Sequence, residues 1–261
     1  MRVVREPQVY LVGRQVVDED AVRAFLEDNE TSWSTETEFG AEKLAELAGR
    51  VCYMSFGAKQ GRKSNTEYME NIIESGHGSV LEHGVWNFVI AGVSRSLTHE
   101  LIRHRAGWGY SQLSQRYVDE STADFVEPDL IAEDPKAHGI WLESVEASHH
   151  AYLKLVERVS ILAEQEFPEL SRTAKRKMAR QSARSVLPNA TETKIFVTAN
   201  ARALRHFIEL RGSDAAEPEI RKVAVKLLEI MQAEAPNIFD DFRLERLPDG
   251  SMGTATGHRK V

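Results

Sequence analysis

The sequence is poor in cysteine, in long apolar runs and in excess positive charge. Its single cysteine, Cys52, excludes an intrachain disulfide and a cysteine-rich metal site. No apolar run approaches the ~18 residues of a membrane-spanning helix. Residues 1–6 are polar, where a signal peptide would need an apolar core. These absences predict a cytoplasmic protein that does not enter a membrane.

The formal net charge of −7 argues against a general nucleic-acid binder, which usually carries a basic excess. With 42% hydrophobic and 28% charged residues, the composition is typical of a globular protein. We find no internal repeat and no linker, so we predict one catalytic domain over residues 1–261. The acidic total still allows a local basic pocket for a small anionic ligand.

Strands and helices do not alternate in a regular β-α-β order. No G-x-G-x-x-G follows a strand, so a doubly wound Rossmann fold is not expected. We predict an α+β fold with a small, mostly antiparallel sheet flanked by long helices, and a frayed tail at residues 247–261. Strand patterns cover residues 9–17, 85–93 and 193–199; helical patterns cover residues 21–27, 41–53, 66–74, 94–105, 138–167, 169–187, 200–211 and 217–233.

Two regions carry expectations about burial. In the helix at residues 41–53, Leu44, Leu47 and Val51 share one face. Cys52 beside them is expected to be a small buried side chain and not a nucleophile. The acidic residues 118–137 include two prolines and are expected to form a surface loop.

The most informative stretch is residues 103–117, R-H-R-A-G-W-G-Y-S-Q-L-S-Q-R-Y, which follows an apolar stripe ending at Leu101. In a continuous helix, Glu100, Arg103 and His104 would share one face. A solvated helix end and a surface loop would explain an arbitrary R-H-R triplet. So many donors together better suit phosphate groups and a heteroaromatic ring, because arginine binds phosphate bidentately and stacks on rings.

A second stretch, residues 76–83, reads G-H-G-S-V-L-E-H and suggests metal ligands. His77 and His83 are six positions apart, however, whereas the helical zinc motifs need two ligands one turn apart. The two glycines also disfavour a regular helix. We therefore predict no metal site, and a turn that leads into the strand at residues 85–93 is the ordinary interpretation.

Two further stretches carry arginines. A basic helix ends in A-R-S-V-L-P with Arg184, and its charge alone fits a solvated face better than a nucleic-acid face. Asn200 is a candidate N-cap, after which Arg202 and His206 share a face at i and i+4. Arg211 lies in the last turn of this helix, where the helix dipole favours a cation.

These four stretches, in this order, resemble the signature elements of the flavin-dependent thymidylate synthases, over roughly residues 40–235. The family carries G-H-x-S/T-x-x-E-H before a strand, R-H-R followed by S-x-x-S-x-R-Y, then A-R-x-V-L-P, and N-A-R…L-R. The chain departs from the family in one place. Residues 106–113 make the spacer before the motif serine one residue longer than usual, within the Gly107-Trp108-Gly109 turn.

The resemblance implies a methyltransferase that converts deoxyuridine monophosphate (dUMP) to thymidine monophosphate (dTMP). Methylenetetrahydrofolate would donate the carbon, NADPH would supply the reducing equivalents and FAD would relay the hydride. The resemblance also implies a homotetramer in which each active site is built from more than one subunit.

The same resemblance implies the site residues, and His77 and Glu82 also match positions that line the family's active site. The cofactor-binding residues would be Ser79, Arg103, His104, Arg105, Gln112, Asn200, Ala201, Arg202 and His206. The substrate-binding residues would be Glu100, Leu101, Ile102, Arg103, Gln112, Leu113, Ser114, Gln115, Arg116, Arg184 and Arg211.

Arg211 is the candidate catalytic residue. Uracil C5 is a poor nucleophile, and Cys52 lacks any resemblance to the cysteine that the unrelated thymidylate synthases add at C6. An arginine against the ring carbonyls and N3 could stabilise an N3-deprotonated, enolate-like uracil. Ser114 has no clear adjacent base, so we expect it to contact the substrate and not to act as a nucleophile.

Two other classes of function compete with this interpretation. A nucleic-acid-binding module would use the basic helix at residues 172–184 together with the R-H-R triplet. A metal-dependent hydrolase would use His77, Glu82, His83 and His104.

Overall fold

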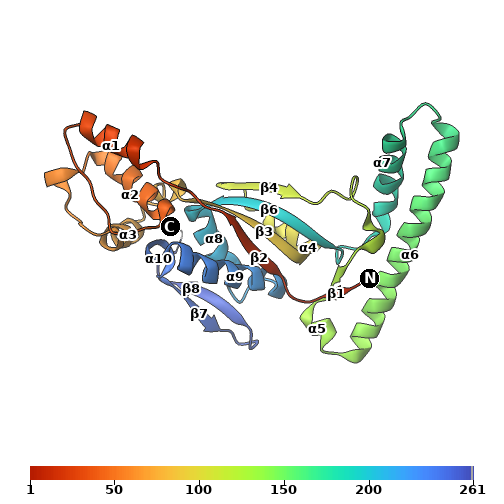
Figure 1. The fold of residues 1–261 in the computed structure, drawn as a ribbon. Helices are drawn as coiled ribbons and strands as arrows, with labels where there is room; N and C mark the ends of the chain where they lie inside the picture. Colours follow the sequence, from red (N-terminus) through yellow and green to blue (C-terminus); the bar gives the residue numbers. More distant parts are fainter. Residues whose placement is uncertain (260) are drawn as a thin grey trace. The chain divides into compact units, whose positions relative to one another are not determined.

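The structure of the protein is a computed structural model that describes residues 1–259 and 261. The chain separates into two compact units, whose elements are labelled in Figure 1. The first unit comprises Met1–Gln8, Ile90–Ile102 and Ser111–Ile195; the second comprises Val9–Val89, Arg103–Tyr110 and Phe196–Val261. That the whole chain forms one catalytic domain stays a prediction.

A four-stranded sheet has the order β2, β3, β6, β4, in which β2 is Gln8–Gly13, β3 is Val85–Ser94, β6 is Glu192–Asn200 and β4 is Trp108–Gln112 (Figure 1). The Leu113 N–H donates to the Lys194 carbonyl, and the Asn200 N–H donates to the Gly107 carbonyl. Since the partner positions rise on one strand as they fall on the other, β4 and β6 are antiparallel.

Two smaller sheets are strand pairs. The strand β7 (Phe242–Arg246) runs antiparallel to β8 (Met252–Thr256), whereas β1 (Val3–Val4) runs parallel to β5 (Phe125–Val126). Helices make up most of the remaining regular structure. The predicted α+β class, with small and mostly antiparallel sheets among long helices, is confirmed.

In the first unit, the long helices α6 (Pro135–Glu166) and α7 (Arg172–Ala183) lie side by side (Figure 1). Each begins at a capping side chain: Asp134 accepts from the Ala137 N–H, and Ser171 accepts from the Ala174 N–H. The unit also contains α4 (Arg95–Leu101), α5 (Asp129–Ala132) and the 3-10 turns η3 (Glu120–Thr122) and η4 (Arg184–Val186).

The prediction of a surface loop at residues 118–137 is wrong. This segment contains η3, β5, α5 and the start of α6. Phe125 is fully buried and packs with Ala123 and Val145, because β5 pairs with β1 and brings its side chains onto α6. Such a short strand inside an acidic sequence leaves no alternating pattern to detect.

The second unit carries the remaining helices. They are α1 (Glu19–Asp28), α2 (Gly40–Tyr53), α3 (Asn65–Glu74), α8 (Ala201–Arg211), α9 (Pro218–Glu234) and α10 (Pro236–Phe239), with the 3-10 turns η1 (Gly57–Lys59) and η2 (Val80–His83). As predicted, Asn200 caps α8, and Leu204, Phe207 and Ile208 of this helix are buried. Apolar positions three and four apart thus fix which face of α8 enters the core.

The prediction of a frayed tail from residue 247 is also wrong. The strand β8 pairs with β7 along its whole length. Thr254 is buried at the end of α8, where its Oγ1 donates to the Ile208 carbonyl and its N–H donates to the Gly212 carbonyl. Small and polar residues form this strand, so only its tertiary partners reveal it.

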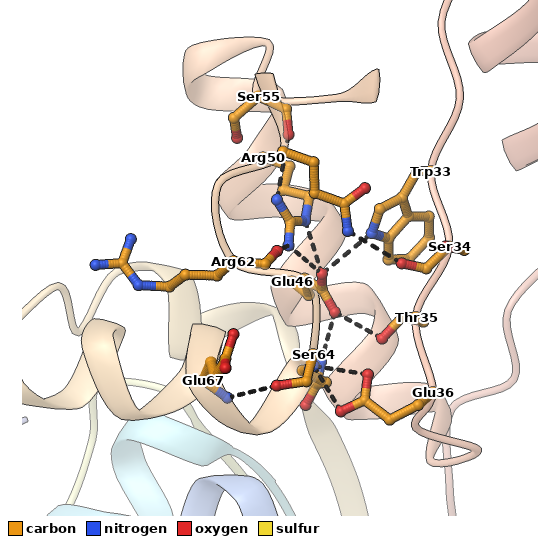
Figure 2. Close-up of polar contacts among 12 residues, drawn as sticks. Trp33, Ser34, Thr35, Glu36, Glu46, Arg50, Ser55, Arg62, Ser64 and Glu67 are labelled. Carbon is orange, nitrogen blue, oxygen red and sulfur yellow. Dashed lines mark hydrogen bonds and ion pairs between the residues drawn. The ribbon is translucent and has the colours of Figure 1, made fainter. Parts of the chain in front are cut away.

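Helix α2 buries a polar face and leaves its apolar face partly exposed. Glu46 and Arg50 are buried and paired at 2.6 Å, and Val51 is exposed. The Glu46 carboxylate also accepts hydrogen bonds from Trp33 Nε1 at 3.1 Å and Thr35 Oγ1 at 2.8 Å (Figure 2). It accepts a further one from Asn65 Nδ2 at 2.8 Å. One carboxylate therefore joins α2, α3 and the chain segment at residues 33–35.

The Arg50 guanidinium completes this cluster. It donates to the backbone carbonyls of Ser55 at 3.2 Å and Arg62 at 2.7 Å, so it also holds the segment between α2 and α3 (Figure 2). The exposure of the opposite face explains why the prediction of a buried Cys52 is wrong: its thiol is exposed and donates to the Ala48 carbonyl at 3.4 Å.

Among the residues that the structure describes, no helix is long and apolar enough to cross a membrane.

Replacing Arg50 with methionine should destabilise the protein by about 3–5 kcal/mol, because it leaves the buried Glu46 carboxylate without its cation. Urea unfolding of the purified variant measures this loss. Arg23→Met is the matched control, since Arg23 pairs with Asp20 on the exposed surface of α1 and its loss should leave the midpoint unchanged. Equal midpoints for Arg50→Met and wild type would show that the buried pair does not stabilise the fold.

Candidate active site

The helix before the R-H-R triplet ends earlier than predicted. Helix α4 stops at Leu101, which is fully buried; Arg103 lies beyond it in a turn and His104 in a stretch without regular secondary structure. The prediction that Glu100, Arg103 and His104 share one helical face is therefore wrong. Along residues 103–105 exposure alternates, since His104 is buried while Arg103 and Arg105 are exposed, as in an extended segment.

His104 is the buried centre of an aromatic cluster in the second unit. Its ring centroid lies 5.1 Å from that of Phe207, 5.8 Å from that of His206 and 6.3 Å from that of Trp108. The Arg211 Nε donates to His104 Nε2 at 3.0 Å. Burial, followed by the charges of Arg211 and His206, lowers the pKa of His104 to about 4, so the imidazole is neutral near pH 7.

Asn200 joins β6 to α8 beside the turn at residues 106–107; Trp108 and Gly109, expected in that turn, belong to β4. Its side chain caps α8 by accepting from the Ala203 N–H at 2.9 Å, and its own N–H donates to the Gly107 carbonyl. Gly107 has φ +75°, and a Cβ there would lie 2.7 Å from the Asn200 amide atoms. Only glycine lets the turn approach the cap this closely. Ala201 is buried and donates to the Gly84 carbonyl.

Arg202 projects from the first turn of α8 toward η2. Its Nη1 donates to Glu82 Oε1 at 2.6 Å, with both side chains about half exposed. Gly78 leaves room for the Arg202 side chain, since a Cβ at that position would lie 2.9 Å from Arg202 Nε. Ser79 precedes η2 and is exposed, and its side chain makes no capping hydrogen bond. Its predicted contact with the flavin stays a prediction.

In the first unit, the motif residues after β4 form a tight turn. The Tyr117 and Val118 N–H groups donate to the Ser114 carbonyl, and the Arg116 N–H lies 3.4 Å from Ser114 Oγ. Gln112 Nε2 donates to Thr98 Oγ1 at 3.1 Å, which ties the motif to α4. These bonds hold the Ser114 hydroxyl and the Arg116 backbone in one fixed turn.

Some arginines of the motifs lack a counter-charge. Several other arginines are paired, among them Arg205 with Asp241 and Arg221 with Asp249, both at 2.6 Å. Within the described part of the chain, no carboxylate forms an ion pair with Arg103, Arg105, Arg116 or Arg184. Guanidinium groups without a carboxylate partner remain available to bind an anionic ligand.

A polar cluster that the sequence did not suggest lies in the first unit. Gln115 and Glu120 are buried, and burial raises the pKa of the Glu120 carboxyl. Within the described residues, Gln115 Nε2, Glu120 Oε1 and Arg95 Nη1 are buried without a hydrogen-bond partner. Glu120 falls in the acidic stretch predicted as a surface loop, so no sequence signal marked it.

The sequence-predicted residues divide between the two units. The second unit holds Ser79, Arg103, His104, Arg105, Asn200, Ala201, Arg202, His206 and Arg211, whereas the first holds Glu100, Leu101, Ile102, Gln112, Leu113, Ser114, Gln115, Arg116 and Arg184. The structure brings His104, His206 and Arg211 together and joins Arg202 to Glu82. The binding and catalytic roles of these residues stay predictions.

The low pKa of His104 predicts that the protein loses stability in mild acid. Below the usual histidine pKa near 6.5, the unfolded chain binds a proton that the folded chain refuses until about pH 4. The free energy of unfolding should therefore rise with pH across this window, by at most about 3 kcal/mol from this group. Urea unfolding at pH 5 and pH 7 measures the effect.

Other groups titrate in the same window, so the comparison needs a variant. His104→Gln cannot take up the proton, and the stability difference between wild type and this variant should shrink by about 2 kcal/mol from pH 7 to pH 5. His150→Gln, at an exposed position on α6, is the matched control. A difference that does not change with pH would contradict a neutral, buried His104.

Comparison with known proteins places this arrangement in a family. Residues 35–237 match the family described as thymidylate synthase complementing protein. The flavin-dependent thymidylate synthase of Mycolicibacterium gilvum is 48% identical over 224 residues, covering 85% of this chain and 87% of that protein. The enzyme of the same name from Corynebacterium glutamicum is 44% identical over 233 residues, covering 89% and 91%.

A solved structure has the same fold at much lower identity. It is the UMP/dUMP methylase PolB from Streptomyces cacaoi, crystallised with 5-Br dUMP. The TM-score is 0.62 at 21% identity, over 92% of this chain and 96% of that one. At this identity the likeness concerns the fold alone.

Membership of this family favours the synthase interpretation over the nucleic-acid-binding module and the metal-dependent hydrolase. It brings with it the enzyme class, a methyltransferase, and the cofactor, FAD. The resemblance seen in the four sequence stretches is confirmed, and the chain belongs to the family of the flavin-dependent thymidylate synthases.

Proposed function

We propose that this chain catalyses the reductive methylation of dUMP to dTMP, with methylenetetrahydrofolate as the carbon donor and NADPH as the reductant. Family membership supports the reaction. The observation that carries the assignment of the site is the set of four motif arginines without a carboxylate partner in the described chain, Arg103, Arg105, Arg116 and Arg184. The nucleotides, the folate and FAD are all anionic, and guanidinium groups bind phosphate oxygens bidentately.

The residues around the N-A-R element fit FAD. Arg103 and Arg105 are exposed cations, and Arg202 packs against Gly78, where a Cβ would meet its side chain. Gly107 allows an equally close backbone approach at the Asn200 amide. These groups, with Ser79 and His206, would hold the cofactor. When bound, FAD supplies the hydride transfer, which no protein side chain can perform.

In the first unit, the turn at residues 114–118 would bind dUMP. Ser114 supplies a hydroxyl, and Arg116 and Arg184 supply cations for the nucleotide phosphate. Gln112 is held by Thr98, so its amide is fixed relative to the turn. Glu100, Leu101, Ile102, Leu113 and Gln115 would complete the substrate contacts from α4 and from the same turn.

Arg211 would act on the uracil ring. Bound at N3 and the ring carbonyls, its guanidinium would stabilise the negative charge that an N3-deprotonated ring spreads over its oxygens, and this charge makes C5 nucleophilic. Cys52 has no part in this proposal, because it belongs to the exposed face of α2.

We propose a homotetramer with shared sites, acting in the cytoplasm without nucleic-acid or membrane partners.

The first test is the visible absorption spectrum of the purified protein, before and after addition of dUMP. An oxidised-flavin spectrum that shifts with the nucleotide would place both ligands in one site. Ser114→Ala should bind dUMP roughly tenfold more weakly in this titration, because it loses one hydrogen bond to the nucleotide. A protein that stays colourless when FAD is supplied, or an unchanged Ser114→Ala affinity, would contradict the assignment.

Arg211→Ala should lower the rate of turnover by at least about a hundredfold, because it loses the stabilisation of the charged ring. Flavin should stay bound in this variant. Flavin content and the rate of dTMP formation measure the two effects separately. Glu209→Ala, at a half-buried position on the same helix, is the matched control for α8 itself. Retained activity in Arg211→Ala would exclude ring activation by this residue.

A further inference from the structure

The contact between Arg211 and His104 fixes the protonation of the imidazole. Arginine has five N–H donors and no acceptor, so the bond from Arg211 Nε at 3.0 Å requires a lone pair on His104 Nε2. His104 is therefore neutral here, with its proton on Nδ1. Protonation at Nε2 would break this bond and would also place the positive imidazolium of His104 next to the positive guanidinium of Arg211.

This bond also sets the orientation of the guanidinium. The Nε–H bond lies in the guanidinium plane, so a fixed acceptor at Nε holds the plane and the direction of the terminal nitrogens. Recognition of a planar ring through N3 and its carbonyls depends on that plane. Arg211 is the last residue of α8, where the backbone alone constrains a long side chain little.

The imidazole is itself held rigidly. Phe207 meets its ring edge-on at 5.1 Å, and the Tyr110 hydroxyl donates to the His104 carbonyl. Trp108 covers a further side at 6.3 Å and stacks on Tyr110 with an interplanar angle of 6°. Packed rings and a backbone anchor allow His104 little freedom to follow a moving arginine.

Trp108 belongs to the segment that is one residue longer than the family pattern. In this segment Gly107 has φ +75° and lies against Asn200, β4 starts at Trp108, and the Trp108 indole packs on both His104 and Phe207. The Trp108 indole thus packs on the imidazole in the same structure in which His104 Nε2 accepts from Arg211.

We propose that His104 is a positioning residue for Arg211. The neutral imidazole packs against Trp108 and Phe207, accepts a hydrogen bond at Nε2, and so orients the Arg211 guanidinium toward the pyrimidine ring. This inference rests on the proposed function, which assigns Arg211 to the ring. His104 acts through Arg211 and takes up no proton in the reaction.

Two substitutions separate positioning from packing. His104→Phe keeps the aromatic packing and removes the acceptor, whereas His104→Gln keeps an acceptor oxygen near the place of Nε2 and loses the ring. Positioning predicts that kcat falls about a hundredfold in His104→Phe, with little change in KM for dUMP, and falls less than about tenfold in His104→Gln. A packing role predicts the opposite order, and that order would overturn the proposal.

Flavin content and the unfolding midpoint of both variants are measured first, so that a folding defect is not taken for a lost function. A second measurement uses the unaltered protein. In histidine labelled with ¹⁵N, the His104 ring should show a protonated Nδ1 and an unprotonated Nε2, whose shift changes in Arg211→Ala. A protonated Nε2 in the wild type would overturn the proposal whether or not the variants fold.

The outcomes distinguish this inference from the proposed function. If the wild-type protein forms no dTMP from dUMP, the function is wrong, but the labelled histidine still reports the Arg211 contact. If the wild type turns over and His104→Phe keeps its kcat, the function stands and the positioning role is wrong.

Discussion

The hydrogen bond from the Asn200 N–H to the Gly107 carbonyl is the constraint on which the second unit's part of the site depends. It closes the antiparallel pair of β4 and β6 at the point where β6 turns into α8. The Asn200 side chain then caps that helix, so the direction of α8, and with it the positions of Arg202, His206 and Arg211, follows from this one junction. Gly107 is required there because a Cβ would collide with the capping amide.

Several arginines of this chain have a structural role, which their partners show. Arg50, Arg205 and Arg221 are buried, bonded to carboxylates and to backbone carbonyls, and act as structural anchors. The motif arginines Arg103 and Arg105 are exposed without such partners in the described chain. Cations without a carboxylate partner at these two neighbouring positions create a local field that favours anions, although the total charge of the protein is negative.

Apolar periodicity and capping residues predicted helix α8 well. Its buried residues include Leu204, Phe207 and Ile208, as the pattern indicated, and the helix begins after the predicted cap Asn200. Periodicity failed at α2, where the buried face contains Glu46 and Arg50. Their burial depends on donors from Trp33, Thr35 and Asn65, which are distant in sequence and follow no local pattern. The hairpin of β7 and β8 was missed for the same reason.

The site could be recognised from motifs, but its geometry could not, and the R-H-R triplet shows why. A helix through residues 103–105 would turn each side chain by about 100° from its neighbour. Because α4 ends at Leu101, the triplet instead alternates between outside and inside, which sends Arg103 and Arg105 outward and His104 into the core. Burial disfavours a charged imidazole, and the donor at Arg211 requires its lone pair. Because α4 ends at Leu101, Arg103 and Arg105 are exposed cations and His104 between them is a buried, neutral acceptor.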